Sequence, residues 1–214
     1  MKHLKKFETQ AAYTTAESNL ALPNVALVKE DNTVHYKPNP CNVHDYVVIG
    51  EIKWATKNVG ACTETDYGNY YQYGGGAATY QETSGETPYD GTGTLPSEYD
   101  TATQVWGDDW RMPTDEEFNS LISATTYSWV TINGVNGGKF TDKNDNSKYV
   151  FFPATGIYNN GSAPSVGGFS YIWTSTATNS TSSKALNINS STHEVNSFGS
   201  RSNYGMPIRP IFKS

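Results

Sequence analysis

The chain has 214 residues, of which 36% are hydrophobic, 13% aromatic and 17% charged, and its formal net charge is −6. Globular domains carry about 45–50% apolar and about 25% charged residues, so this chain is low in both. Its 15 Tyr, 8 Phe and 5 Trp argue against disorder, and its acidic balance argues against a nucleic-acid-binding protein. The length predicts one domain, or one domain with an arm.

The sequence shows no targeting signal and no membrane span. Residues 1–8 are basic but have no apolar core, so we expect no secretory signal peptide in this chain. No apolar run approaches the ~18 residues of a membrane-spanning helix, so we expect no membrane insertion. Cys41 and Cys62 are too few for a disulfide scaffold in a chain of this length, and we expect two free, partly buried thiols.

Residues 1–44 are predicted to form an N-terminal arm. Alanine and leucine give weak helical spacing between residues 7 and 22. The apolar segments 25–28 and 33–36 flank a polar turn and predict a β-hairpin, which two X-Pro steps at 37–40 bring to an end. We expect this segment to mediate assembly or attachment and to lie outside the main core.

Residues 45–214 are predicted to form one α+β domain with two helices and several short antiparallel strands. The first helix is expected at 100–105. The second is expected at 115–124, because Thr114 and Glu117 have the spacing of a capping box.

Strands are predicted where apolar or alternating segments lie between turn residues, and the glycine-rich segment 64–97 is expected to be a loop. The expected strands are 46–49, 52–55, 127–132, 138–142, 148–152, 171–175, 184–189, 193–198 and 206–212.

Small polar residues gather at 159–204, where Ser, Asn, Thr and Gly predominate. Leu186 and Ile188 are expected to face the core, and Asn187 and Asn189 to face away from it, because successive side chains of a strand point to opposite faces. Composition leaves two interpretations open. The stretch is either a set of solvated loops or a binding surface in which Tyr supplies rigid contact area and Ser and Asn supply hydrogen bonds.

The sequence offers little support for metal binding or catalysis. Residues 142–147 imitate a calcium loop in part, but Ser147 replaces the turn glycine and Pro153 replaces the last glutamate ligand. We predict a polar turn there, and no metal or cofactor. No nucleophile elbow is present, and Cys41 and His44 lie in a proline-rich linker, so we expect no enzyme.

Eight motifs in the second part of the chain carry a family resemblance. They are HDYVVIG (44–50), IKWATKNVGA (52–61), YGNYY (67–71), WGDDWRMPT (106–114), NGVNG (133–137), FFPATG (151–156), YIWTS (171–175) and YGMPIRPI (204–211). In this order they resemble the Fibrobacter succinogenes major paralogous domain, which is common in gut Bacteroidetes and their phages. The family is similar to the formylglycine-generating-enzyme type of C-type lectin fold, so the resemblance implies that fold.

The resemblance also implies a function. Such domains often serve as variable proteins of diversity-generating retroelements, in which adenine-directed substitutions alter the C-terminal part and Asn codons are a favoured template. Residues 171–204 look like such a variable region. The implied function is a ligand-binding adhesin or phage receptor-binding protein; the alternative is a non-diversified structural or interaction domain of a phage tail or bacterial surface.

The expected location is a phage virion or a bacterial cell surface, where the ligand would be an unidentified protein or glycan. The arm at 1–44 is expected to support a homo-oligomer. The expected ligand-contacting residues on the variable surface are Tyr171, Trp173, Asn187, Asn189, Ser191, His193, Asn196, Phe198, Ser200, Ser202, Asn203 and Tyr204.

The chain departs from the family at two positions. Lys57 stands where Cys is frequent, which weakens any disulfide inference, and Pro207 stands where Ser is usual. Catalysis is not inherited from the related enzymes, because they depend on a C-terminal cysteine pair and both cysteines here are early. Calcium-dependent sugar binding is not implied either, since neither Glu-Pro-Asn nor Trp-Asn-Asp occurs.

Two further expectations concern the interior. Arg209 is expected to make a structural ion pair or a carbonyl contact, with Asp108 or Asp109 as the proposed acidic partners. Three tryptophans are expected to anchor the layer beneath the variable positions: Trp110, Trp129 and Trp173. For Trp173, the alternative is exposure on the binding surface.

Overall fold

The structure is a computed structural model that describes residues 5–6, 26–28, 34–36, 40–76, 88–159, 161–199 and 201–213. The chain divides into two compact units, Met1–Val43 and His44–Ser214.

The first unit contains a small three-stranded sheet. Its strands are β1 (Lys5–Lys6), β2 (Ala26–Val28) and β3 (Val34–Tyr36), and the 3-10 helix η1 (Pro40–Asn42) follows. Strands β2 and β3 pair antiparallel, which confirms the predicted hairpin, and β1 pairs with β2 in parallel. The helical spacing predicted at 7–22 lies outside the described residues.

The second unit is a mixed α+β domain with two helices and four antiparallel sheets in its described part. In chain order its elements are β4 (Tyr46–Ile49), β5 (Ile52–Ala55), β6 (Tyr71–Gln72), β7 (Gly93–Thr94), α2 (Thr101–Trp106), β8 (Trp110–Arg111), α3 (Asp115–Ala124), β9 (Thr125–Ile132), β10 (Val135–Asp142), β11 (Tyr149–Pro153), β12 (Phe169–Ala177), β13 (Ser183–Asn189), β14 (His193–Phe198), η2 (Arg201–Asn203), β15 (Gly205–Met206) and β16 (Ile211–Phe212).

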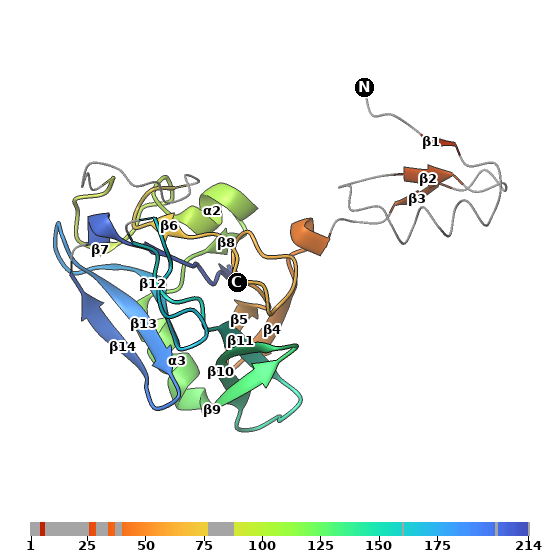
Figure 1. The fold of residues 1–214 in the computed structure, drawn as a ribbon. Coiled ribbons are helices and arrows are strands. Elements are labelled where there is room, and N and C mark those ends of the chain that lie inside the picture. The colour runs from red at the N-terminus through yellow and green to blue at the C-terminus, as the bar shows by residue number, and fades with distance from the viewer. Residues whose placement is uncertain are drawn as a thin grey trace. The chain divides into compact units, whose positions relative to one another are not determined.

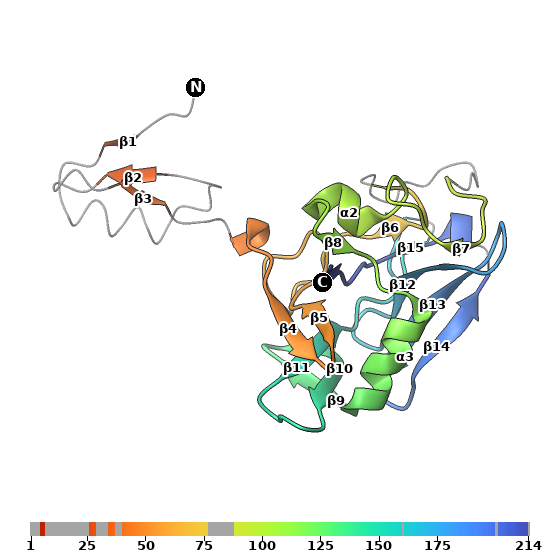
Figure 2. The ribbon, with the colours of Figure 1, turned by 180° about the vertical axis from the view of Figure 1, so that it is seen from behind.

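Helix α3 packs against one face of the four-stranded sheet ordered β14-β13-β12-β7 (Figures 1 and 2). The meander β9-β10-β11 also contacts α3, and its first turn places Asn133 and Gly134 at positive φ, as a two-residue hairpin turn requires. The other four-stranded sheet, β4-β5-β16-β8, brings the C-terminal strand between two strands from earlier in the domain.

The predicted helices and most predicted strands are confirmed, with shifts of at most three residues at their ends. The strand predicted at 206–212 is interrupted, because Pro207 and Pro210 have no N–H to donate to a ladder. The segment 64–97, predicted to be a loop, contains the short strands β6 and β7.

The N-terminus of α3 is fixed by the predicted capping box. The Thr114 hydroxyl accepts a bond from the Glu117 amide at 3.2 Å, and the Glu117 carboxylate accepts one from the Thr114 amide at 2.8 Å. Arg111 donates to both oxygens of the same carboxylate, so β8 and the helix start are joined. The buried face of the helix presents Phe118 and Leu121.

Two hydrophobic cores lie on opposite sides of the β12–β13 pair. We call the first the helix-side core; its buried members are Ile49, Trp54, Phe118, Leu121, Phe140, Val150, Phe152, Ile172, Leu186, Ile188 and Ile211. We call the second the tyrosine-side core; its buried members are Val59, Tyr71, Tyr73, Leu95, Ala102, Met112, Trp173, Ala177, Ala185, Met206 and Ile208.

The three tryptophans expected beneath the variable positions differ in their places. Trp173 is fully buried in the tyrosine-side core. Trp110 is buried too, but it packs edge-on against Trp106 and Phe212. Trp129 is only half-buried on β9, so it is not a buried anchor.

Arg209 is fully buried and binds only neutral acceptors. Its Nε donates to Asn58 Oδ1 at 2.9 Å, and its two terminal nitrogens donate to the carbonyls of Ala55 and Phe151 at 3.0 and 2.8 Å. Burial lowers the pKa of Arg209 to about 9, so the guanidinium is still charged at neutral pH. The expected carbonyl contact is therefore confirmed.

The expected acidic partners of Arg209 are wrong. Asp108 and Asp109 are exposed in the turn between α2 and β8. The two carboxylates therefore stay in water. The planar Arg209 guanidinium, which has five N–H groups, instead donates to backbone carbonyls inside the protein.

Replacing Arg209 should destabilise the fold. Arg209→Met would leave three buried acceptors without a donor, and each orphaned acceptor costs about 1–3 kcal/mol. We expect the free energy of unfolding in urea to fall by at least about 3 kcal/mol. Arg209→Lys should restore little of this stability, because a lysine ammonium cannot place donors at the three acceptors as the planar guanidinium does. Lys148→Met, at an exposed position, is the control; wild-type stability of Arg209→Met would contradict the assigned role.

Glu117 should make stability sensitive to acid. Burial raises the pKa of Glu117, but bonds from Arg111 and Thr114 outweigh burial and hold that pKa below its usual range. The stabilisation that Glu117 provides is therefore complete above its pKa in the unfolded chain, about 4.3. It is lost as the pH falls through the lower pKa of Glu117 in the folded protein. Urea unfolding of Glu117→Gln should show lower stability at pH 7 and a smaller loss toward pH 3. Equal acid sensitivity in Glu117→Gln and the wild type, with the exposed Glu116→Gln as control, would contradict this.

Candidate ligand-binding site

The outer face of the β12–β13 pair changes from core to open surface along the strands. Trp173 is fully buried on this face, whereas the next cross-strand pairs, Tyr171–Asn187 and Phe169–Asn189, are only half-buried. Because side chains alternate along a strand, all five residues lie on the same face. The fully buried part of the tyrosine-side core thus ends at Trp173. Tyr171 packs against its edge, and the face beyond Trp173 is half-buried.

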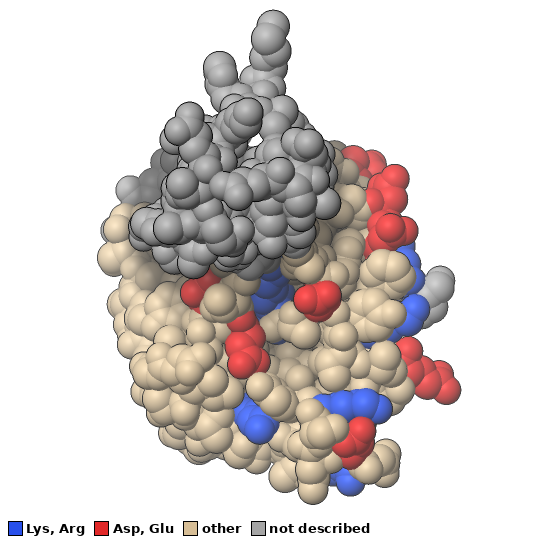
Figure 3. Space-filling model, turned by 90° about the vertical axis from the view of Figure 1, so that its right-hand side faces the viewer, with Lys and Arg blue, Asp and Glu red and all other residues tan. Residues whose placement is uncertain are grey.

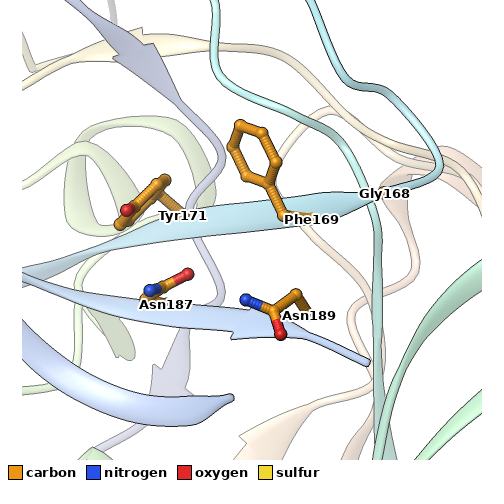
Figure 4. A pocket seen from close by; sticks show the side chains of 5 residues that line it. All are labelled: Gly168, Phe169, Tyr171, Asn187 and Asn189. Carbon is orange, nitrogen blue, oxygen red and sulfur yellow. The ribbon is translucent and has the colours of Figure 1, made fainter. Parts of the chain in front are cut away.

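An open cavity of about 330 Å³ lies at this half-buried end, lined by Gly168, Phe169, Tyr171, Asn187 and Asn189. In Figure 4 two aromatic rings stand on β12 and two amides on the neighbouring β13, all on one side of the strands. The volume lies at the low end of the range of small-ligand pockets, about 300–1,000 Å³. No charged side chain belongs to this lining.

Aromatic rings continue from the cavity across the sheet. Phe169 and Tyr171 have ring centroids 5.7 Å apart at 77°, Tyr171 lies 5.2 Å from Phe198, and Phe198 lies 5.1 Å from Tyr204. We call these four half-buried residues the aromatic row. Each ring is held by a neighbour, so the row offers contact area with little side-chain freedom left to lose.

The two amides of the cavity have different tasks. Asn189 Oδ1 accepts from the amides of Ser191 and Thr192 at 2.9 and 2.8 Å, which closes the β13–β14 turn. Its nitrogen points toward Asn187 in Figure 4. The Asn187 side chain has no hydrogen-bond partner among the described residues, so both its donor and its acceptor are available to a ligand.

Several other expected residues join this surface. Asn196 and Phe198 on β14 share the face of Asn187, since Asn196 pairs with Ala185 and Phe198 with Ser183. Ser202 and Asn203 belong to η2, which Tyr204 follows, and the Ser202 carbonyl accepts from Gln72 at 3.1 Å. Tyr204 reaches the sheet through its ring contact with Phe198.

Two expected residues are not on the surface. Trp173 is fully buried, and its indole nitrogen donates to the Tyr71 carbonyl at 2.9 Å. His193 lies on the opposite face, where it stacks on Tyr127 at 4.2 Å, because it pairs with the core residue Ile188. Both assignments are corrected.

Two expected residues remain. Ser191 is exposed in the β13–β14 turn, where its amide and hydroxyl bond to Asn189. Ser200 lies outside the described residues.

Sequence reasoning missed Gly168 and Phe169. The predicted variable region begins at Tyr171, but β12 begins at Phe169, two residues earlier and therefore on the same face. The alternation of Phe169, Tyr171 and Trp173 is a signal that could have found Phe169. Gly168 contributes from outside the strand, and no sequence signal marks it as a lining residue.

The cross-strand neighbour of Asn187 on β14 is acidic. Glu194 is exposed on β14 opposite Asn187, and its Oε1 accepts from Asn196 at 2.9 Å. Lys184 belongs to the other face, where its Nζ donates to Ser197. Figure 3 shows another side of the molecule, on which lysine and arginine of the described residues lie among acidic residues.

Neither cysteine is a free thiol. Cys41 and Cys62 are both disulfide-bonded, which overturns the expectation of two free thiols and leaves neither as a nucleophile. His44 stacks on Trp106 with ring centroids 3.9 Å apart, and burial lowers the pKa of His44.

The calcium-like segment 142–147 forms the turn between β10 and β11. Asp142 accepts from the Asn144 amide at 2.7 Å, and Asp145 accepts from Ser147. These carboxylates therefore stabilise the turn itself. Across the described ranges, no three His, Cys, Asp or Glu side chains are grouped as metal ligands.

Comparisons with protein-family models, curated proteins and solved structures found no match. Within the described part of the chain, the helices are too short or too polar to cross a membrane.

The two cavity amides should respond differently to truncation. Asn189→Ala removes the acceptor that closes the turn and should lower the free energy of unfolding by about 1–2 kcal/mol. Asn187→Ala removes no side-chain hydrogen bond within the described residues and should stay within about 0.5 kcal/mol of wild type. Urea unfolding of the two variants side by side checks this pair, and equal losses would contradict the division of tasks.

Proposed function

We propose that this chain is a ligand-binding protein, an adhesin or a phage receptor-binding protein, that displays an exchangeable surface on a C-type lectin fold. The observation that carries the proposal is the half-buried outer face of β12–β14, where the cavity opens at the end of the tyrosine-side core and the aromatic row packs along the edge of that core. The motif resemblance to the Fibrobacter succinogenes major paralogous domain supports the same class.

Diversification by a retroelement is part of the proposal. Substitutions can accumulate without loss of the fold only where side chains do not hold the core. Asn187 and Asn196 meet this requirement, whereas the alternating Leu186 and Ile188 are fully buried. We therefore place the exchangeable positions within about 171–204 and leave out Asn189, because its side chain closes a turn.

The proposed location is a phage virion or a bacterial cell surface. Two disulfide-bonded cysteines favour an oxidising environment over a reducing cytosol. The N-terminal unit would attach or oligomerise the chain, and several copies would raise a weak single-site affinity through avidity.

Cell binding tests the proposed function. Fluorescently labelled protein should bind some members of a panel of bacterial cells. The double variant Tyr171→Ala/Asn187→Ala should lose at least about 90% of that binding, because it removes a ring and an available amide from the cavity. Asn146→Ala, exposed in the β10–β11 turn, is the matched control. Undiminished binding by the double variant would favour a fixed structural domain that uses another surface.

The flanking DNA tests diversification separately. We expect a nearby reverse transcriptase and a near-copy of the codons for 171–204 that differs at adenines. Close strains whose codons lack adenine-linked variation would contradict diversification and leave ligand binding by a fixed surface.

A further inference from the structure

We propose that the cavity between β12 and β13 binds one neutral, hydroxylated sugar ring, a hexose or N-acetylhexosamine unit of a surface glycan. This inference rests on the proposed ligand-binding function and names the ligand class of that site. The juxtaposition that carries it is two aromatic rings on β12 facing two amides on β13 around a space of about 330 Å³.

The aromatic side of the cavity fits the apolar side of such a ring. Phe169 and Tyr171 stand at 77° to each other, so a ligand meets the face of one ring and the edge of the other. Sugar C–H groups project from the faces of the pyranose ring and can lie against an aromatic face, which excludes water from both. Tyr171 is held from behind by Phe198 at 5.2 Å, so this surface is present before the ligand arrives.

The amide side fits the hydroxyl groups. A hydroxyl both donates and accepts, and an amide side chain offers both functions. Asn187 has neither function occupied within the described residues, and it can turn to suit the ligand. Asn189 is fixed by the turn through its oxygen, which leaves its nitrogen as an oriented donor. One fixed donor and one adaptable amide are suited to a pair of neighbouring hydroxyls.

The electrostatics select neutral sugars over anionic ones. Recognition of a carboxylate or phosphate calls for arginine, lysine or converging backbone amides. The lining contains no such cation, and the exposed carboxylate of Glu194 lies on the strand next to Asn187. A sialylated or phosphorylated ligand would meet repulsion without a compensating positive charge, and this disfavours an anionic terminal unit.

The test is saturation-transfer NMR and titration of the full chain with methyl glycosides of glucose, galactose, mannose and N-acetylglucosamine, with a methyl sialoside alongside. An open site should hold a single ring weakly, with a Kd on the order of 1 mM. We expect at least one neutral glycoside to bind, and the sialoside to give no saturation transfer.

Variants localise the binding. Asn187→Ala, which removes no side-chain hydrogen bond within the described residues, should raise the Kd at least about fivefold, as expected for the loss of hydrogen bonds to the ligand. Tyr171→Ala should raise it about tenfold. Asn146→Ala, exposed in the β10–β11 turn and outside the cavity lining, is the control and should bind as wild type does.

Three results would overturn the sugar assignment: no neutral glycoside binds, the sialoside binds equally well, or Asn187→Ala binds as wild type does. If labelled protein still binds cells through the cavity while all glycosides fail, the proposed function stands and the sugar assignment fails. Loss of that cell binding after protease treatment, but not after periodate oxidation, identifies a protein ligand and likewise overturns the sugar assignment alone. If neither cells nor glycosides are bound, both proposals fail.

Discussion

Three segments that lie far apart in the sequence meet at the buried guanidinium of Arg209. It joins the chain before the C-terminal strand to Asn58, to the end of β5 through Ala55, and to β11 through Phe151. A charge without a carboxylate partner is tolerated there because every bond goes to a dipolar acceptor and the ring of Phe152 lies 4.7 Å away. Strands β5 and β11, which belong to two different sheets, are thereby joined.

The packing of the two cores determines which part of the β12–β13 pair remains open to solvent. The β12–β13 pair is held on one side by the helix-side core and, at the Trp173 end of the other side, by the tyrosine-side core. Beyond Trp173 the fully buried part of the second core ends, and the strands continue for two more cross-strand pairs. In these pairs Tyr171 packs against the edge of the tyrosine-side core and Asn189 closes the β13–β14 turn, while the Asn187 side chain makes no hydrogen bond within the described residues. The cavity therefore forms where the β12–β13 pair extends beyond the fully buried part of the tyrosine-side core.

Much of the fold could be predicted because local signals were strong. The capping box at Thr114, the alternation of Leu186 and Ile188, and the Asn133–Gly134 turn each depend on neighbours close in sequence. The face of His193 could have been predicted too, since alternation along the strand 193–198 separates His193 from Asn196 and Phe198. The partners of Arg209 and the disulfide bonding of the cysteines could not be predicted, because they are long-range facts. In the site, the amides were predictable, while the cavity itself arises from where a second core stops.

The domain should keep its fold whatever side chains stand on its open face. Thermal unfolding of two libraries measures this directly: one randomises Asn187, Asn196 and Asn203, and the other randomises Leu186 and Ile188. Most members of the first library should unfold within about 2 °C of wild type, since surface substitutions change stability by about 0.5 kcal/mol or less. Most members of the second should not fold. Equal losses in both libraries would show that the open face is part of the folding core.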